Sequence, residues 1–252
     1  MKNIRNLILS FLYLLCLYLS VKFLPLSDWI PLPWATILVR TFLLFLLSAL
    51  TIYEARKYRP YPSEKRIHPL FFLPFWIICS SNLLYGGMML NIEFSIDWPI
   101  FLASAAELVV SVLLEEILFR FLLLEALLVW LEKRKQGNIL PLLLCAFCFS
   151  LMHLINLLGN TWDSVLIQLG YTFFLGIVLS FIALYSNRTF LPFLAHASFN
   201  FLNSLLFSSV YTLGTMTWQY VVLASLLGII FLLYLLILYL IRIRKKEKND
   251  VS

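Results

Sequence analysis

Charged residues are scarce in this sequence. They make up only 13% of its 252 residues, about half the share of an ordinary soluble domain, whereas hydrophobic residues make up 62%. The mean hydropathy is correspondingly high, at +0.92. Because a soluble protein of this length has no way to bury so much apolar surface, the composition excludes a soluble fold and indicates a protein whose natural solvent is lipid.

Several familiar motifs are missing as well. No G-x-S-x-G elbow or Ser-His pair is present, so nothing favours a covalent serine hydrolase. The zinc-protease motif H-E-x-x-H is absent too. No A-x-A site follows the first apolar run, which is also too long for a signal peptide, so we expect a retained span there.

Cysteine is rare, and its four occurrences lie inside apolar runs. Cys145 and Cys148 have the C-x-x-C spacing of a redox or zinc site. Nothing polar or basic lies near them in the sequence to stabilise a thiolate. We therefore expect them to be small apolar side chains within a membrane helix.

Eight apolar runs are long enough to cross a bilayer, which takes roughly 20 helical residues. They lie at residues 6–24, 34–53, 70–90, 99–130, 139–158, 164–185, 190–207 and 218–241. None alternates as a strand does, and lipid admits only helices or closed barrels. The sequence predicts an all-α bundle of about eight transmembrane helices, forming one integral membrane domain over residues 1–252.

The basic residues indicate how this bundle is oriented. Sixteen of the nineteen lysines and arginines lie in the terminal segments and loops on one side of the eight-span arrangement. The opposite loops hold only acidic charges: Asp28, Glu93, Asp97 and Asp163. The positive-inside rule then places both termini in the cytoplasm, and a bacterial cytoplasmic membrane is expected. Basic residues split among short loops suit anionic lipid and give no support for nucleic-acid binding.

The fourth predicted span concentrates the charges that lie within the membrane, where charges are costly and usually functional. It contains Glu107, Glu115, Glu116, Arg120 and Glu125. Glu115 shares a narrow helical arc with two serines, which predicts that it faces the bundle interior. Glu116 and Arg120 are four residues apart and form an expected ion pair, either structural or in support of a site.

Glu115 has no cation at four residues before or after it, so it needs a partner from another helix. Arg40 offers a charge in the second span, but His153, His196 and Asn200 are better candidates. A carboxylate and a neutral imidazole can activate water, and a histidine and an asparagine on one helix face can donate hydrogen bonds to an oxyanion. This combination predicts hydrolysis of a carbonyl compound without a cofactor. Glutamate and histidine also ligate zinc, so a metal-activated water stays open.

These residues fall into three motifs in order. Residues 115–120 read E-E-x-x-x-R, residues 149–153 read F-x-x-x-H, and residues 196–200 read H-x-x-x-N. Together, on separate predicted spans, they resemble the CAAX protease and bacteriocin-processing (Abi) family, which includes the type II CAAX prenyl endopeptidases. The resemblance covers roughly residues 100–205, within an expected protease core at about 99–207.

The resemblance implies an intramembrane glutamate protease that cleaves a membrane-associated protein or peptide. In that pattern Glu115 and His153 activate the water, and His196 and Asn200 stabilise the oxyanion. The implied supporting residues are Glu116, Arg120 and Phe149. Family members that act on prenylated proteins remove a C-terminal tripeptide, whereas many bacterial members are linked to peptide processing, self-immunity or regulation of membrane signalling proteins. One departure is Phe121, which stands where the family often has glycine.

Two other functions compete with proteolysis. The chain is alternatively a non-catalytic membrane adaptor or bacteriocin self-immunity protein that regulates a membrane partner, although no motif residue is lost. Buried glutamate and histidine also serve proton-coupled transporters, but no inverted repeat supports this. The sequence leaves the oligomeric state open.

Overall fold

The computed structural model describes residues 2–56, 97–132, 139–186 and 190–201, and within these ranges the protein is all-helical, as predicted. The N-terminal elements are α1 (Lys2–Lys22), the 3₁₀ turn η1 (Leu26–Asp28) and α2 (Pro33–Ala55). One long helical stretch follows, made of α4 (Trp98–Glu116), the π-helix η3 (Ile117–Leu123) and α5 (Leu124–Glu132). The remaining elements are α6 (Ile139–Met152), the 3₁₀ helix η4 (His153–Leu158), α7 (Trp162–Ser186) and α8 (Phe190–Asn200).

Four of the described helical stretches are long and apolar enough to cross a membrane: Arg5–Asp28, Pro33–Ala55, Ile139–Leu158 and Trp162–Leu184. They coincide with the predicted spans at 6–24, 34–53, 139–158 and 164–185 and make this a multi-pass membrane protein. The predicted spans at 70–90 and 218–241 lie outside the described residues, as do His68 and most of the basic loop residues. The count of eight spans and the cytoplasmic placement of both ends therefore stay predictions.

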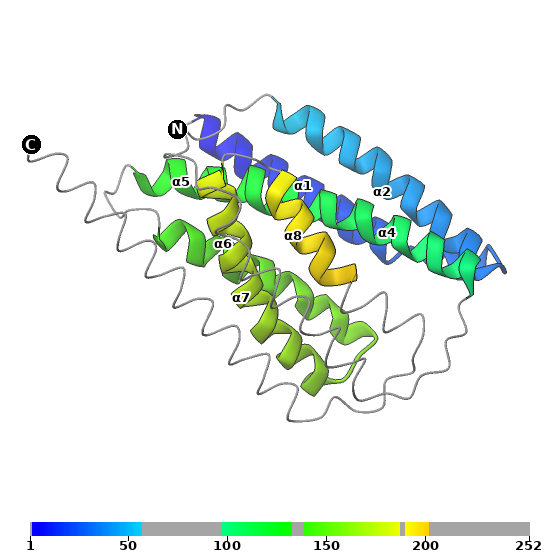
Figure 1. Cartoon of the computed structure of the whole chain (residues 1–252). Helices are drawn as coiled ribbons and strands as arrows, with labels where there is room; N and C mark the ends of the chain where they lie inside the picture. Colours follow the sequence, from blue (N-terminus) through cyan, green and yellow to red (C-terminus); the bar gives the residue numbers. More distant parts are fainter. Residues whose placement is uncertain (1, 57–96, 133–138, 187–189, 202–252) are drawn as a thin grey trace, which may run out of the picture.

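The helices form two packed pairs joined by α8 (Figure 1). Helices α2 and α4 pack along their lengths, and α1 packs against α2 and η3. Helices α6 and α7 form the second pair. Helix α8 contacts both α4 and α7, so it bridges the two pairs and brings its polar face to the end of α4.

Local sequence signals fix the start of α4, the helix that carries the glutamates. The Asp97 side chain caps the helix by accepting a hydrogen bond from the backbone N–H of Ile100 at 3.2 Å. Pro99 follows in the first turn, where its missing N–H costs nothing. These signals set the register that places Glu115 and Glu116 at the other end of the helix.

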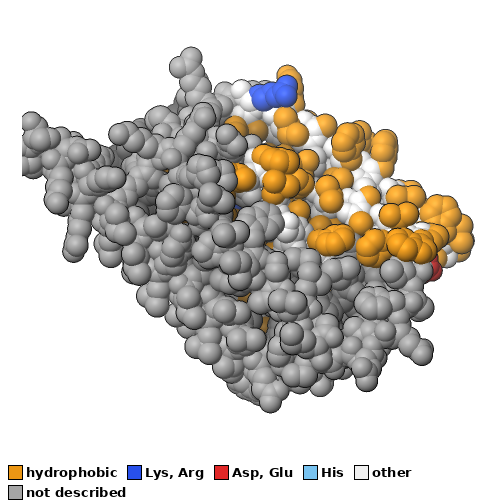
Figure 2. Space-filling model, in the orientation of Figure 1, with side chains coloured by type: hydrophobic (Ala, Val, Ile, Leu, Met, Phe, Trp, Pro, Cys, Tyr) orange, Lys and Arg blue, Asp and Glu red, His pale blue; other side chains and the backbone are white. Residues whose placement is uncertain are grey.

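The described outer face of the bundle is apolar. Phe42 and Leu102 are each 61% exposed, on α2 and α4 respectively, and Figure 2 shows hydrophobic side chains covering this face with few charges. In water such a surface would be an aggregation hazard, but against hydrocarbon it is the expected one.

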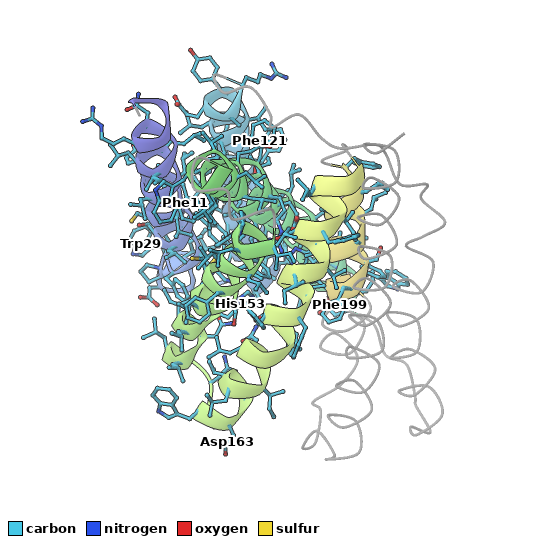
Figure 3. The ribbon with its side chains drawn as sticks, turned by 90° about the vertical axis from the view of Figure 1, so that its left-hand side faces the viewer. Phe11, Trp29, Phe121, His153, Asp163 and Phe199 are labelled. Carbon is cyan, nitrogen blue, oxygen red and sulfur yellow. The ribbon has the colours of Figure 1, made fainter. Side chains whose placement is uncertain are left out.

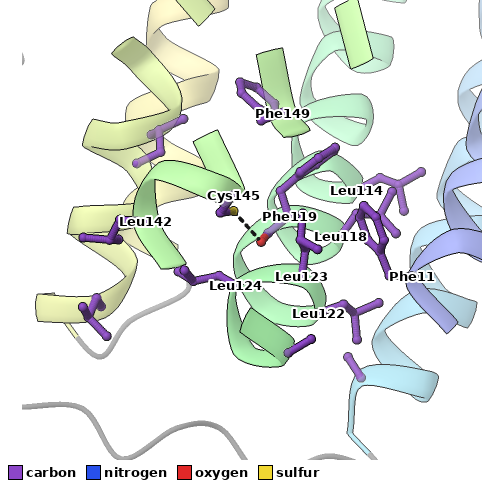
Figure 4. Packing of buried hydrophobic residues seen from close by; sticks show 14 of the residues in the cluster. Phe11, Leu114, Leu118, Phe119, Leu122, Leu123, Leu124, Leu142, Cys145 and Phe149 are labelled. Atoms are coloured by element: carbon purple, nitrogen blue, oxygen red, sulfur yellow. Dashed lines mark hydrogen bonds between the residues drawn. The ribbon is translucent and has the colours of Figure 1, made fainter. Parts of the chain in front are cut away.

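The core centres on Phe119, which is buried in η3 (Figure 4). Its ring packs edge-on against Phe11 of α1 at 5.4 Å and against Phe149 of α6 at 5.2 Å between centroids. The Cys145 thiol donates to the Phe119 carbonyl at 3.1 Å, while Cys145 and Cys148 are both free cysteines. The predicted single helix over 99–130 is thus interrupted by a π turn, and the Phe119 carbonyl within it accepts from both the Leu124 backbone N–H and the Cys145 thiol.

Helices α6 and α7 approach closely at Gly176. A Cβ built there would lie 3.0 Å from the Cα and 3.1 Å from the Cβ of Ala146 on α6. Near this contact the Ser150 hydroxyl donates to the Leu169 carbonyl at 2.7 Å. The two helices are therefore so close at Gly176 that any larger side chain would require α6 to shift.

Replacing Gly176 by valine is expected to destabilise the protein by about 1–3 kcal/mol, because the new side chain overpacks against the Ala146 backbone. The measurement is thermal unfolding of the purified protein in detergent. Gly170→Val is the matched control, since a Cβ at Gly170 on the same helix meets no atom within 4 Å. An equal loss of thermal stability in both variants would contradict the close contact.

Candidate active site

The predicted site residues come from three separate parts of the bundle. Glu115 and Glu116 are the last residues of α4, and Arg120 follows in η3. Phe149 lies on α6, and His153 opens η4, where the α-helix of the fifth predicted span changes to a 3₁₀ helix. Residues His196 and Asn200 lie one turn apart on α8.

His196 joins these elements, because its imidazole reaches both glutamates. Its Nδ1 lies 2.8 Å from Glu116 Oε1, and its Nε2 lies 3.8 Å from Glu115 Oε2. The ring is 2% exposed. An ionised carboxylate only accepts hydrogen bonds, so beside ionised Glu116 the Nδ1 carries the proton. In the neutral ring Nε2 is then an acceptor, and the Asn200 amide nitrogen lies 3.2 Å from it.

Glu115 is buried and divides its two oxygens between different helices. Oε2 faces His196, and Oε1 accepts a 2.5 Å hydrogen bond from the hydroxyl of Tyr18 on α1. Sequence reasoning overlooked Tyr18. A signal existed, because Tyr18 continues the buried stripe of Leu7, Phe11 and Leu14, and a buried phenol requires a hydrogen-bond partner.

His153 is oriented by its own helix. Its Nδ1 lies 3.0 Å from the Phe149 carbonyl oxygen, which can only accept, so Nδ1 carries the proton and Nε2 is left with its lone pair. His153 and Glu115 lie within electrostatic range of each other, with no direct hydrogen bond between them among the described residues. In the view of Figure 3, His153 lies inside the bundle, between the N-terminal helices and α8.

The aromatic ring of Phe149 packs against the polar side chains of the site. Its ring packs edge-on against His153 at 5.1 Å and against His196 at 5.5 Å between centroids. The guanidinium of Arg120 lies over the same ring at 4.3 Å. One buried ring thus fixes the planes of both histidines and the position of the arginine.

Arg120 and Glu116 are close, as their spacing predicts, but the contact is loose. Arg120 Nη1 lies 3.4 Å from Glu116 Oε1, and both side chains are almost completely buried. Within the part of the chain that the structure describes, no guanidinium nitrogen of Arg120 has a hydrogen-bond partner. The distance defines an ion pair without hydrogen-bond geometry, so attraction and the Phe149 ring hold the guanidinium in place.

The sequence offers Arg40 as a possible charge partner of Glu115, but the structure does not pair these two residues. The Nη1 of Arg40 instead lies 3.4 Å from Glu107 Oε1, joining α2 to α4 two turns away from Glu115. Both partners are partly exposed. A group of three His, Cys, Asp or Glu side chains able to hold a metal is not found within the described ranges.

Residues 97–202 match the family model described as "Type II CAAX prenyl endopeptidase Rce1-like", which confirms the resemblance indicated by the three motifs. No curated protein and no solved structure matches the chain. The match begins at the N-cap of α4 and ends just past α8, so it contains both glutamates, Arg120, both site histidines and Asn200. At family level it supports a CAAX-protease-like intramembrane endopeptidase with a membrane-associated substrate.

Replacing Arg120 by alanine is expected to lower folded yield and to cost about 3–5 kcal/mol, because Glu116 keeps its buried charge and loses the nearby cation. Detergent-solubilised yield and thermal unfolding measure this. Arg40→Ala is the control, since its partly exposed pair should be worth about 1 kcal/mol or less. Normal yield and stability of the Arg120 variant would show that the ion pair does not contribute to the stability of the fold.

Proposed function

We propose that this protein is an intramembrane endopeptidase, because residues 97–202 match the type II CAAX prenyl endopeptidase model. Its substrate is a membrane-associated protein or peptide. The nucleophile is a water molecule and not a side chain of the enzyme. The observation that carries the proposal is the position of His196, whose ring contacts Glu116 and faces Glu115 within the membrane-embedded bundle.

Glu115 and His153 activate the water in this proposal. Glu115 takes the proton as the water oxygen bonds to the carbonyl carbon of the scissile peptide. His153 presents Nε2 as a second acceptor, because its Nδ1 is held by the Phe149 carbonyl. The carbon–nitrogen bond then breaks as the proton held by Glu115 passes to the leaving amine, so the water is divided between the two products.

His196 and Asn200 stabilise the negative oxygen of the tetrahedral intermediate. The Asn200 amide can donate directly, whereas His196 donates through Nε2 only when both ring nitrogens carry protons. Glu116 fixes the orientation of that ring, because it accepts from Nδ1 at 2.8 Å in a buried setting. Glu116 and Arg120 therefore act through His196 and do not touch the substrate.

Substitution of Glu115 by alanine is expected to abolish cleavage while the protein stays in the membrane at normal levels, because the base is removed. The measurement compares protein termini in the membrane and secreted fractions of cells that express the wild type or the variant. Termini that vanish only with Glu115→Ala identify the substrate.

The matched control for this comparison is Glu107→Gln, on the same helix but paired with Arg40. Its termini are expected to resemble those of the wild type. Identical termini in wild type and Glu115→Ala, with the variant still rescuing loss of the gene, would refute the protease and favour the adaptor or immunity function.

Asn200→Ala is expected to lower kcat about a hundredfold or more with little change in KM, because an oxyanion donor acts mainly in the transition state. The rate is measured on a peptide that spans the cleavage site found above. Asn160→Ala provides the control, since Asn160 is exposed and its side chain donates to the nearby Asn156 carbonyl, away from the site residues. A proportional rise in KM with unchanged kcat would place Asn200 in substrate binding instead.

A further inference from the structure

We propose that Tyr18 is a positioning residue for Glu115, so that the N-terminal helix α1 completes the site from outside the family-matched segment. The inference rests on the proposed function, because the task of Tyr18 is to hold the base in place. Tyr18 precedes residues 97–202 by a long stretch of chain, and none of the three motifs includes it.

The burial of Tyr18 shows that its hydroxyl has a dedicated partner. The side chain is fully buried, at 0% exposure, and its hydroxyl donates to Glu115 Oε1 at 2.5 Å. A buried phenol without a partner is costly, and a hydrogen bond to an ionised acceptor is roughly twice as strong as a neutral one. The tyrosine and the glutamate therefore satisfy each other.

The direction of this bond matters for the reaction. A glutamate side chain can rotate about three bonds: the first two move the carboxylate, and the third turns its plane. Tyr18 occupies Oε1, while Oε2 faces His196 Nε2 at 3.8 Å. The phenol thus holds the carboxylate in the orientation that directs its other oxygen to the histidine side of the site.

Two further contacts hold α1 and the tyrosine ring in place. Phe11, two turns earlier on α1, packs edge-on against Phe119 of η3 at 5.4 Å, which fixes α1 against the segment that directly follows Glu115. One turn after Tyr18, the Lys22 ammonium lies 5.6 Å from the centre of the tyrosine ring. The hydroxyl is therefore presented from an anchored helix and an ordered ring.

A positioning role predicts a specific kinetic signature. Without the hydroxyl, Glu115 samples orientations that do not face the water, so the fraction of productive encounters falls while substrate contacts persist. Tyr18→Phe is expected to lower kcat at least tenfold with KM within about twofold of the wild-type value. The control is Tyr13→Phe. Tyr13 lies on the same helix and is 63% exposed, so its substitution should change neither kcat nor KM.

The kinetic experiment uses the full-length protein in detergent and a peptide spanning the Glu115-dependent cleavage site. A parallel thermal-unfolding cycle combines Tyr18→Phe with Glu115→Ala and requires no substrate. Tyr18→Phe alone should lower the Tm by about 3 °C or more. In the Glu115→Ala background the same change should lower it no further, because the acceptor is already gone.

The outcomes separate this inference from the proposed function. Coupled Tm values together with a fall in kcat support Tyr18 as a positioning residue. Wild-type kcat in Tyr18→Phe, or equal Tm losses in both backgrounds, would overturn it. If no termini depend on Glu115, the protease proposal fails by itself, and the Tm cycle still decides whether Tyr18 holds the Glu115 carboxylate.

Discussion

The contact between His196 and Glu116 is the interaction on which the rest of the polar centre depends. A buried carboxylate far from water is tolerated only when it is paired and hydrogen-bonded. The 2.8 Å contact gives Glu116 Oε1 its hydrogen bond, fixes the proton on Nδ1 and turns Nε2 toward Glu115 and Asn200. One ring orientation therefore determines the partners of two glutamates and an asparagine, and it ties α8 to the end of α4.

The same constraint explains how neighbouring helices are arranged around α4. Each acidic residue of that helix receives a polar partner from elsewhere: Arg40 of α2 for Glu107, Tyr18 of α1 for Glu115, and His196 of α8 for Glu116. In a membrane there is little hydrophobic drive between helices, so such polar contacts add specificity to van der Waals packing. The close approach at Gly176 supplies the complementary, purely steric contact between α6 and α7.

Much of this was accessible from the sequence, because composition and spacing act locally. The apolar runs predicted the helical class, and the spacing of Glu116 and Arg120 predicted their contact. The sequence predicts that His196 lies near Glu115, but it does not predict the contact of its Nδ1 with Glu116. Partner choice between helices depends on their rotation and crossing, which no local pattern encodes; this is why Arg40 was considered for Glu115 and Tyr18 was overlooked. The π turn escaped prediction for a related reason, since residues 117–123 are as apolar as any α-helical segment.

The π turn also sets an unusual rule for how this sequence can change in length. A π turn holds one residue more than the α-helix it interrupts. Removing a single residue from Ile117–Leu123 would restore an uninterrupted α-helix and leave the residues of α5 facing much as they do now. Removing one residue from the regular α-helix on either side would instead rotate everything after it by about 100°. A change of one residue in length is therefore tolerated better inside this segment than in the helices that flank it.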